Sequence, residues 1–196
     1  MALTPAQERA NHILLSIRDL AVEFAGDGGG VFRALGGVSF DIPSGSTVAL
    51  VGESGSGKSV TAQAIMRILP KKGRIAAGSI LFDEAGGVPV DIAQLPPGSE
   101  AMRALRGGRI AMIFQEPMTS LSPLHTVGDQ VTEALQLHCK VTPQEARAEA
   151  ERVFARVGFP DPKRTFVTYP FELSGGMRQR AMIAMALICK PALLIA

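Results

Sequence analysis

The sequence has few of the residues that would indicate a secreted or metal-binding protein. Its 196 residues include only two cysteines, Cys139 and Cys189, which lie fifty positions apart without C-x-x-C spacing. This separation predicts buried thiols in a reducing compartment rather than a disulfide or a metal site. The three histidines, His12, His125 and His138, show no ligand spacing either.

The sequence also lacks a large net charge and long apolar runs. The 20 Lys and Arg residues nearly balance the 18 Asp and Glu residues, so the net charge of +2 gives no reason to expect a nucleic-acid partner. The most apolar region, residues 181–196, is interrupted by Lys190 and Pro191 and is shorter than the roughly 20 residues of a membrane span. Residues 1–11 are polar and lack the apolar core of a signal peptide. We therefore expect a cytoplasmic chain, at most docked on a membrane protein.

The strongest positive signal is a glycine-rich loop, G-E-S-G-S-G-K-S, at residues 52–59. It matches the pattern G-x-x-x-x-G-K-[ST], in which backbone N–H groups converge on the phosphates of a nucleotide. Residues 46–51 predict a buried parallel strand before the loop, and residues 60–69 predict a helix that Pro70 ends. A glycine-rich turn that carries a lysine by chance is the alternative, and it does not explain this strand–loop–helix context.

Each loop residue has an expected part in binding. Lys58 would reach the β- and γ-phosphates, and the Ser59 hydroxyl would bind Mg²⁺. We assign nucleotide binding to the whole loop and to the residue after it: Gly52, Glu53, Ser54, Gly55, Ser56, Gly57, Lys58, Ser59 and Val60.

The rest of the chain predicts two kinds of architecture. Short alternating strands and glycine-rich turns indicate antiparallel hairpins at residues 13–40 and 78–90. No Lys or Ser follows the glycines at 28–30 in a helical context, so we interpret them as a hairpin tip rather than a second phosphate loop. Buried strands are expected at 109–114 and 192–196, with helices at 127–138, 142–157 and 175–189. Residues 128–169 therefore form a helical insertion between two strands of one parallel sheet.

A second candidate anion site lies in L-S-G-G-M-R-Q-R, at residues 173–180. Ser174 is a good N-cap, and glycines stand where the first exposed N–H groups of the next helix would be. Such a helix start can bind an anion, but it can equally be a capped helix whose glycines permit tight packing. The residues alone leave both readings open.

Three motifs together carry a family resemblance. The phosphate loop, F-Q-E-P-M-T-S-L-S-P at 114–123 and the motif at 173–180 resemble, in order and spacing, the ATP-binding cassette (ABC) ATPases of dipeptide and oligopeptide importers. The resemblance extends from about residue 14 to 196 and implies an α/β fold: a P-loop NTPase core with a parallel sheet, an N-terminal antiparallel β subdomain and a helical insertion subdomain. It implies one domain, with the core and β subdomain at about 13–114 and 190–196, and the Q-loop, helical subdomain and signature helix at about 115–189.

The resemblance also implies roles for single residues. Gln115 would join the Mg²⁺ and the attacking water and would sense the transporter. Ser174, Gly175 and Gly176 would belong to the signature that covers the γ-phosphate of ATP held by a partner subunit. Phe24 is the candidate for stacking on adenine, although it can equally be a core strand residue, and Phe32 competes for the role.

The chain departs from the importer pattern in three places. Ser122 stands where Asn is usual before Pro, and Phe171 stands where His is frequent. Neither position touches phosphate chemistry. The third departure follows residues 193–196, which should lead into an Asp-Glu pair that binds Mg²⁺ and polarises water. The 196 residues as they stand, without that pair, are expected to bind ATP weakly and to hydrolyse it negligibly.

By this resemblance the chain is the ATP-binding and ATP-hydrolysing subunit of an importer for peptides or similar small solutes. Its expected partners are transmembrane permease subunits, a second ATPase subunit and, indirectly, a periplasmic solute-binding protein, with no nucleic acid. Its expected place is the cytoplasmic face of the bacterial inner membrane. Two alternatives are a nucleotide-binding module without turnover and a cassette ATPase that acts on nucleic acid or ribosomes.

Overall fold

The computed structural model describes residues 12–26, 28–84, 86–114 and 121–196. The chain divides into two compact units, Met1–Met102 and Arg103–Ala196. Each unit has its own elements and its own part of the candidate site, and each is described by itself.

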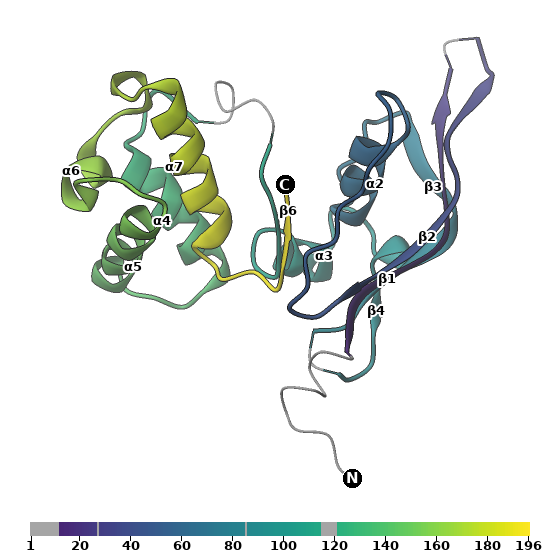
Figure 1. Ribbon diagram of the computed structural model, residues 1–196, viewed down its shortest axis with the longest axis horizontal. Coiled ribbons are helices and arrows are strands. Elements are labelled where there is room, and N and C mark those ends of the chain that lie inside the picture. The colour runs from purple at the N-terminus through teal and green to yellow at the C-terminus, as the bar shows by residue number, and fades with distance from the viewer. Residues whose placement is uncertain (1–11, 27, 85, 115–120) are drawn as a thin grey trace. The chain divides into compact units, whose positions relative to one another are not determined.

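The first unit contains a four-stranded antiparallel sheet in the order β2-β1-β3-β4 (Figure 1). Its strands are β1 (Ile13–Ala25), β2 (Val31–Pro43), β3 (Gly73–Phe82) and β4 (Val90–Asp91). Phe24 pairs with Phe32 across the first hairpin, and Phe82 pairs with Val90 across the second. Both predicted hairpins are therefore confirmed, although β4 begins only at Val90.

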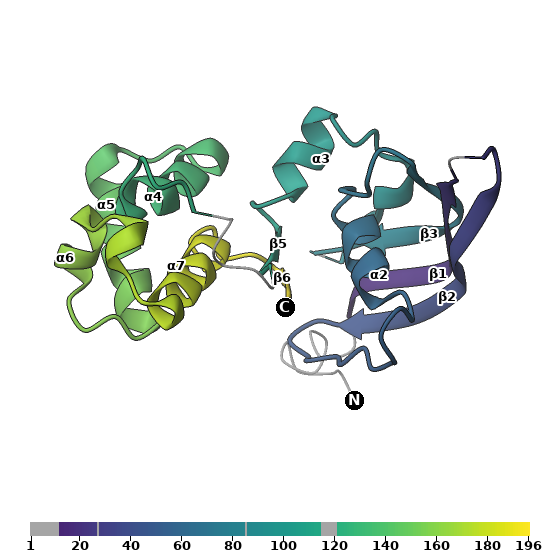
Figure 2. The same cartoon turned by 90° about the horizontal axis from the view of Figure 1, so that it is seen from above.

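Helix α2 (Lys58–Ile65) lies over one face of this sheet (Figure 2). It is shorter than the predicted helix over 60–69, because Arg67 adopts a left-handed backbone with φ of 53°. The Arg67 N–H then donates to Ala64 O at 3.1 Å, and the Ile68 N–H donates to Gln63 O at 2.9 Å. These two bonds form a Schellman motif, so the helix ends before Pro70 can act.

The predicted parallel strand over residues 46–51 is wrong for this structure. The segment has no regular secondary structure and no strand pairing, and Val48, Leu50 and Val51 are 45%, 46% and 90% exposed. A parallel strand exists through hydrogen bonds to its neighbours, and no described strand supplies them to this segment. The apolar character that predicts a buried strand is present, but the pairing that makes one is not.

Two short helices follow the sheet in the sequence before the second unit begins. The 3-10 helix η1 (Ile92–Gln94) follows β4, and α3 (Glu100–Leu105) runs across the boundary between the units. Ile92 and Met102 are both fully buried.

The second unit is a set of helices placed between two paired strands. Strands β5 (Ile110–Met112) and β6 (Leu193–Ile195) are parallel, with Ile110 opposite Leu193. Between them come α4 (Val127–His138), α5 (Pro143–Arg156), α6 (Pro162–Val167), the 3-10 helix η2 (Pro170–Glu172) and α7 (Gly175–Leu187). The predicted helical insertion between two parallel strands is therefore confirmed.

Side-chain caps explain where these helices begin. The hydroxyl of Thr126 accepts the Asp129 N–H at the start of α4, and Asp161 accepts the Arg164 N–H at the start of α6. Thr142 forms the predicted capping box with Glu145 at the start of α5. The Thr142 backbone N–H and hydroxyl both donate to the Glu145 carboxylate, and these hydrogen bonds lower the pKa of that carboxyl.

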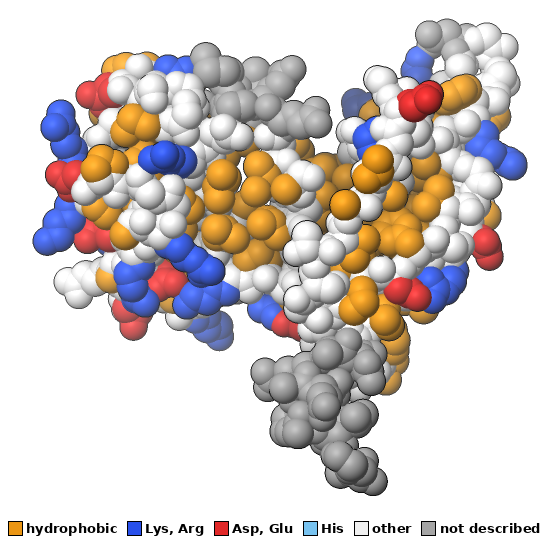
Figure 3. Space-filling view, in the orientation of Figure 1, with side chains coloured by type: hydrophobic (Ala, Val, Ile, Leu, Met, Phe, Trp, Pro, Cys, Tyr) orange, Lys and Arg blue, Asp and Glu red, His pale blue; other side chains and the backbone are white. Residues whose placement is uncertain are grey.

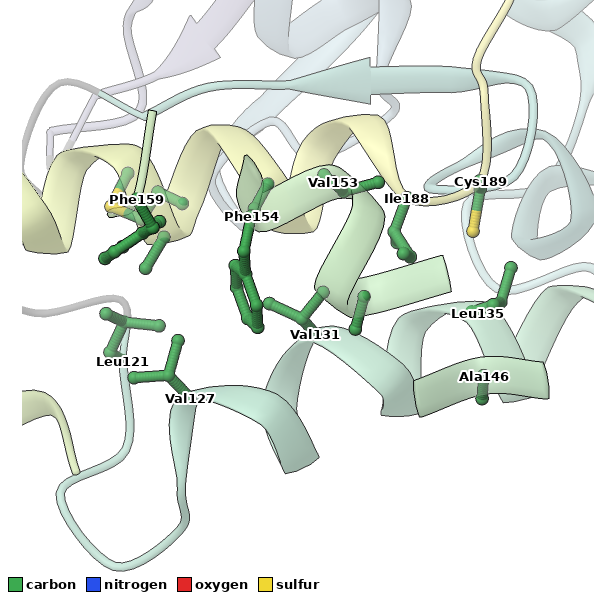
Figure 4. Packing of buried hydrophobic residues seen from close by; sticks show 14 of the residues in the cluster. Leu121, Val127, Val131, Leu135, Ala146, Val153, Phe154, Phe159, Ile188 and Cys189 are labelled. Atoms are coloured by element: carbon green, nitrogen blue, oxygen red, sulfur yellow. The ribbon is translucent and has the colours of Figure 1, made fainter. Parts of the chain in front are cut away.

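The helices of the second unit enclose an apolar core (Figure 4). Phe154 of α5 is fully buried, and its ring meets that of Phe159 edge to face, with centroids 5.4 Å apart. At the end of α5, Gly158 turns the chain with φ of 89°, and its carbonyl accepts a 2.6 Å hydrogen bond from Arg180 of α7. This contact ties α7 to the rest of the helical core.

The surface of the second unit mixes both signs of charge, as its visible face shows (Figure 3). On α5, Arg147 pairs with Glu151 at 3.0 Å, and Arg152 pairs with Glu149 at 2.7 Å. Pairs of this kind each stabilise an exposed helix by about 0.3–0.5 kcal/mol. Within the described ranges, no helix has the length and apolar character needed to cross a bilayer.

Replacing Phe154 with alanine should lower the free energy of unfolding by about 3–5 kcal/mol, because it opens a cavity in the centre of the core. Urea denaturation followed by circular dichroism measures the change. Leu137→Ala is the matched control, since Leu137 is 74% exposed and its loss should change stability by no more than about 0.5 kcal/mol. Equal effects of the two substitutions would contradict the assignment of this core.

Candidate functional site

The phosphate loop is held against the sheet by a close backbone approach at Gly57. Gly57 precedes α2 with φ of 95°, a conformation that favours glycine. A Cβ built there would clash with Leu35 Cδ2 and lie 3.3 Å from Ala34 O, both in β2. At the start of the loop, a Cβ on Gly52 would lie 2.5 Å from Ser56 Oγ. The positive φ and the nearby Ala34 backbone therefore favour glycine at position 57, whereas a Cβ at position 52 would require the Ser56 side chain to move.

The Lys58 ammonium group folds back into the loop. Its Nζ donates to the carbonyl oxygens of Gly52 at 2.6 Å and Glu53 at 2.7 Å, and lies 3.4 Å from Ser56 Oγ. The loop thus places a positive charge next to its own backbone, where an anion bound by the loop would meet it.

The start of α2 adds further donors. The Thr61 N–H donates to Gly57 O at 2.8 Å, which is the first hydrogen bond of the helix. The N–H groups of Lys58, Ser59 and Val60 precede that bond and have no acceptor within the helix. Together with the positive end of the helix dipole, they form a suitable site for phosphate oxygens.

The two candidate aromatics share the sheet face that carries this loop. Val22 pairs with Leu35, the residue beneath Gly57. The register shift that follows skips Ala34 of β2, whereas β1 keeps its alternation against β3, so both Val22 and Phe24 lie on that face. Phe32 pairs with Phe24 and is 67% exposed. The Phe24 ring is half-buried and covers Gly73, where a Cβ would lie 2.7 Å from it.

The opposite face of the same strands carries charge. Glu23 accepts from Arg33 at 3.3 Å and from Arg74 at 2.8 Å, one on each neighbouring strand. This alternation shows that the aromatic face is separate from the ion pairs.

The second motif opens α7. The Ser174 hydroxyl accepts the Met177 N–H at 3.4 Å, so the predicted N-cap is confirmed. Buried Leu173 anchors the turn, while Gly175 and Gly176 are exposed, and a Cβ on either would have no neighbour within 4 Å. The exposed helix start therefore presents bare backbone N–H groups to solvent.

The predicted site residues fall into different parts of the chain. The loop and both aromatics belong to the first unit, and the motif of Ser174 belongs to the second. Gln115 lies outside the described residues. Within the described residues no three His, Cys, Asp or Glu side chains gather as a metal site. Of the two expected Mg²⁺ ligands, Ser59 and Gln115, the structure describes Ser59.

Sequence reasoning missed the residues that support the site. Leu35 and Ala34, which pack beneath Gly57, carry no motif that could have indicated them. Arg180 lies at the end of the second motif, but its partner Gly158 is 22 residues away. Only the folded arrangement reveals these contacts.

Comparisons with known proteins agree with these features. The family model described as ABC transporter matches residues 35–196. A probable peptide ABC transporter ATP-binding protein of Sinorhizobium fredii is 51% identical over 185 residues, covering 94% of this chain and 53% of that protein. The dipeptide transport ATP-binding protein DppD of Bacillus subtilis is 49% identical over 184 residues, covering 93% and 52%. The chain spans about half the length of these curated relatives.

Solved structures show the same fold. A dimeric bacterial ABC transporter cassette superposes with a TM-score of 0.77 at 24% identity, covering 92% of this chain and 72% of that one. The cbiO1 protein of Clostridium perfringens, part of an ABC transporter complex, superposes with a TM-score of 0.69 at 26% identity, covering 94% and 64%.

Gly57→Ala should destabilise the loop more than Gly55→Ala. Both glycines have positive φ, 95° and 82°, so each alanine stores strain of about 1–2 kcal/mol. Only at Gly57 does the new methyl group also collide with Leu35 and Ala34, because the space around Gly55 is open. Hydrogen exchange at α2 measures the local loss for each variant. Equal exchange in the two variants would show that the contact with β2 does not hold the loop.

Proposed function

Because this chain belongs to the ABC transporter family, we propose that it is the ATP-binding and ATP-hydrolysing subunit of an importer for peptides or similar small solutes. The observation that carries the proposal is the glycine-built loop with Lys58 inside it, at the start of α2. Relatives named for peptide and dipeptide transport support the class of solute.

In this proposal the loop holds the phosphates of ATP. Backbone N–H groups from Glu53 to Val60 orient the phosphate chain, and Lys58 exchanges its bonds to the carbonyls of Gly52 and Glu53 for bonds to phosphate oxygens. Ser59 and Gln115 would hold Mg²⁺, which would neutralise charge on the phosphates. Phe24 stacks on adenine from the sheet face that also carries the loop.

The second motif completes the site of another subunit. Ser174, Gly175 and Gly176 cap the γ-phosphate of ATP held by the loop of a partner chain, using the open helix start of α7. ATP binding then clamps two subunits together, and hydrolysis with release of phosphate separates them.

The proposed partners of this pair are the transmembrane permease subunits, at the cytoplasmic face of the bacterial inner membrane. They would dock where the segment of Gln115 meets the helical insertion. Exposed apolar side chains on both sides of that segment support this placement: Phe114 is 52% exposed before it and Leu124 is 81% exposed after it. A periplasmic solute-binding protein would deliver the solute to the permeases.

Lys58→Ala should weaken nucleotide binding at least tenfold, because a charge-assisted contact to phosphate is worth about 1.5–3 kcal/mol. Titration with a fluorescent ATP analogue measures the dissociation constant. Lys71→Ala is the control, since Lys71 is an exposed lysine of the same unit outside the loop. Unchanged affinity in a folded Lys58 variant would remove the phosphate-loop assignment.

Ser174→Arg should leave nucleotide binding by one chain nearly intact but prevent two chains from pairing around ATP. The bulky cation would occupy the helix start that covers the partner's phosphate. Sedimentation with a slowly hydrolysed ATP analogue distinguishes the paired from the single state. Thr142→Arg is the matched control, because it removes an exposed N-cap of α5 at a similar cost of about 1 kcal/mol. An arginine variant at 174 that still pairs would refute the role in trans.

A further inference from the structure

The fold brings together two cysteines that the sequence separates. Cys139 ends α4, and Cys189 follows α7 in the connection to β6. Both line a pocket of about 400 Å³ within the second unit. In Figure 4 the Cys189 side chain points toward α4, where Leu135 lies. The prediction of buried thiols holds for Cys189, which is 9% exposed, whereas Cys139 is only half-buried.

The two thiols lie in the wall of the same pocket. Burial, followed by the charge and hydrogen bonding of the Cys139 thiol, raises the pKa of the Cys189 thiol to about 11. The Cys189 thiol also donates to Ala134 O at 3.5 Å. Cys189 is therefore a protonated, enclosed thiol, and Cys139 is its more accessible neighbour.

The charged residues around this pocket form ion pairs and hydrogen bonds. Glu149 accepts from Arg152 at 2.7 Å and from Lys190 at 2.9 Å. The Glu145 carboxylate serves the capping box of α5, accepting the Thr142 N–H at 2.8 Å. The charged wall residues thus neutralise one another or cap α5, and the two thiols are the reactive groups of the pocket.

We propose that Cys139 and Cys189 are a reversible dithiol–disulfide site, oxidised by a low-molecular-weight disulfide. The Cys139 thiolate attacks one sulfur of the small disulfide, and the first small thiolate leaves. The Cys189 thiol loses its proton to solvent and attacks the Cys139 sulfur of the mixed disulfide, which releases the second small thiolate. Two protein thiols are oxidised by two electrons, and one disulfide is reduced to two thiols.

A disulfide at this site would restrict the helix that carries the second motif. A bond between residues 139 and 189 would join the end of α4 to the connection between α7 and β6. It would therefore fix the C-terminal end of α7 against the helical core, at the end opposite Ser174. The site requires no nucleotide, so its test is independent of the proposed transport function.

The test incubates the folded full chain with oxidised glutathione, blocks free thiols by alkylation and locates the products by peptide mass mapping. The wild-type chain should form an internal bond between Cys139 and Cys189. Cys189→Ser should stop at a mixed disulfide on Cys139, and Cys139→Ser should stay reduced. Closure in the wild type should accelerate as the pH rises from 7 to 9, because burial keeps the pKa of the Cys189 thiol high and its thiolate fraction still increases over this range.

A wild-type chain that stays reduced, keeps the mixed disulfide or links to a second chain would overturn the proposal. A second measurement stands even if the serine variants do not fold. The equilibrium constant for internal disulfide formation with glutathione should be at least tenfold larger in the folded chain than in urea. An equal or smaller constant would show that the fold does not bring the sulfur atoms into bonding geometry.

Discussion

The contact between the Gly57 backbone and β2 is the constraint on which the candidate site depends. It lets α2 begin directly above Leu35 and Ala34, with no side chain to hold the helix away. The loop that precedes α2 must then turn sharply, and the positive φ at Gly55 and Gly57 allows it. Lys58, as the first helical residue, falls within reach of the carbonyls of Gly52 and Glu53. This one contact between Gly57 and β2 therefore determines the positions of α2, of the phosphate loop and of the Lys58 ammonium group.

The second unit positions its motif by different means. Helix α7 packs into the core around Phe154, and Arg180 binds the carbonyl of Gly158 at the end of α5. A second arginine, Arg178, donates to Pro170 O at 2.8 Å in the turn before the helix. The core and the two arginine hydrogen bonds thus hold α7 in place, while Gly175 and Gly176 at its start stay exposed. Rigid support beneath an exposed helix end favours a site that must meet a ligand in one geometry.

Local features of the fold could be predicted from the sequence, and non-local ones could not. The capping box of Thr142, the N-cap of Ser174 and the hairpin around residues 26–30 are decided within a few residues, and the structure confirms them. The strand predicted over residues 46–51 is wrong because a parallel strand depends on partners far along the chain. The end of α2 depends on an arginine in a conformation that glycine usually adopts.

The same distinction applies to the candidate site. The phosphate loop is visible in the sequence because its spacing reflects its own backbone geometry. The support from Leu35 and the meeting of Cys139 with Cys189 arise from tertiary packing, and no local pattern encodes them. Gln115 and the choice between Phe24 and Phe32 stay predictions.

The glycines of the two motifs differ in a way that bears on function. Gly57 has a positive φ and touches β2, so the fold itself requires glycine there. Gly175 and Gly176 adopt helical backbone in open space, where any side chain would fit within the described structure. Glycine is a poorer helix former than alanine, by about 1 kcal/mol in a helix interior and by less at the first helical positions. Among the described residues no contact requires glycine at these two positions, which favours a role for a group outside the chain that approaches the backbone closely. A phosphate held by a second subunit is such a group, which fits the proposal that the motif of Ser174 acts on a partner's nucleotide.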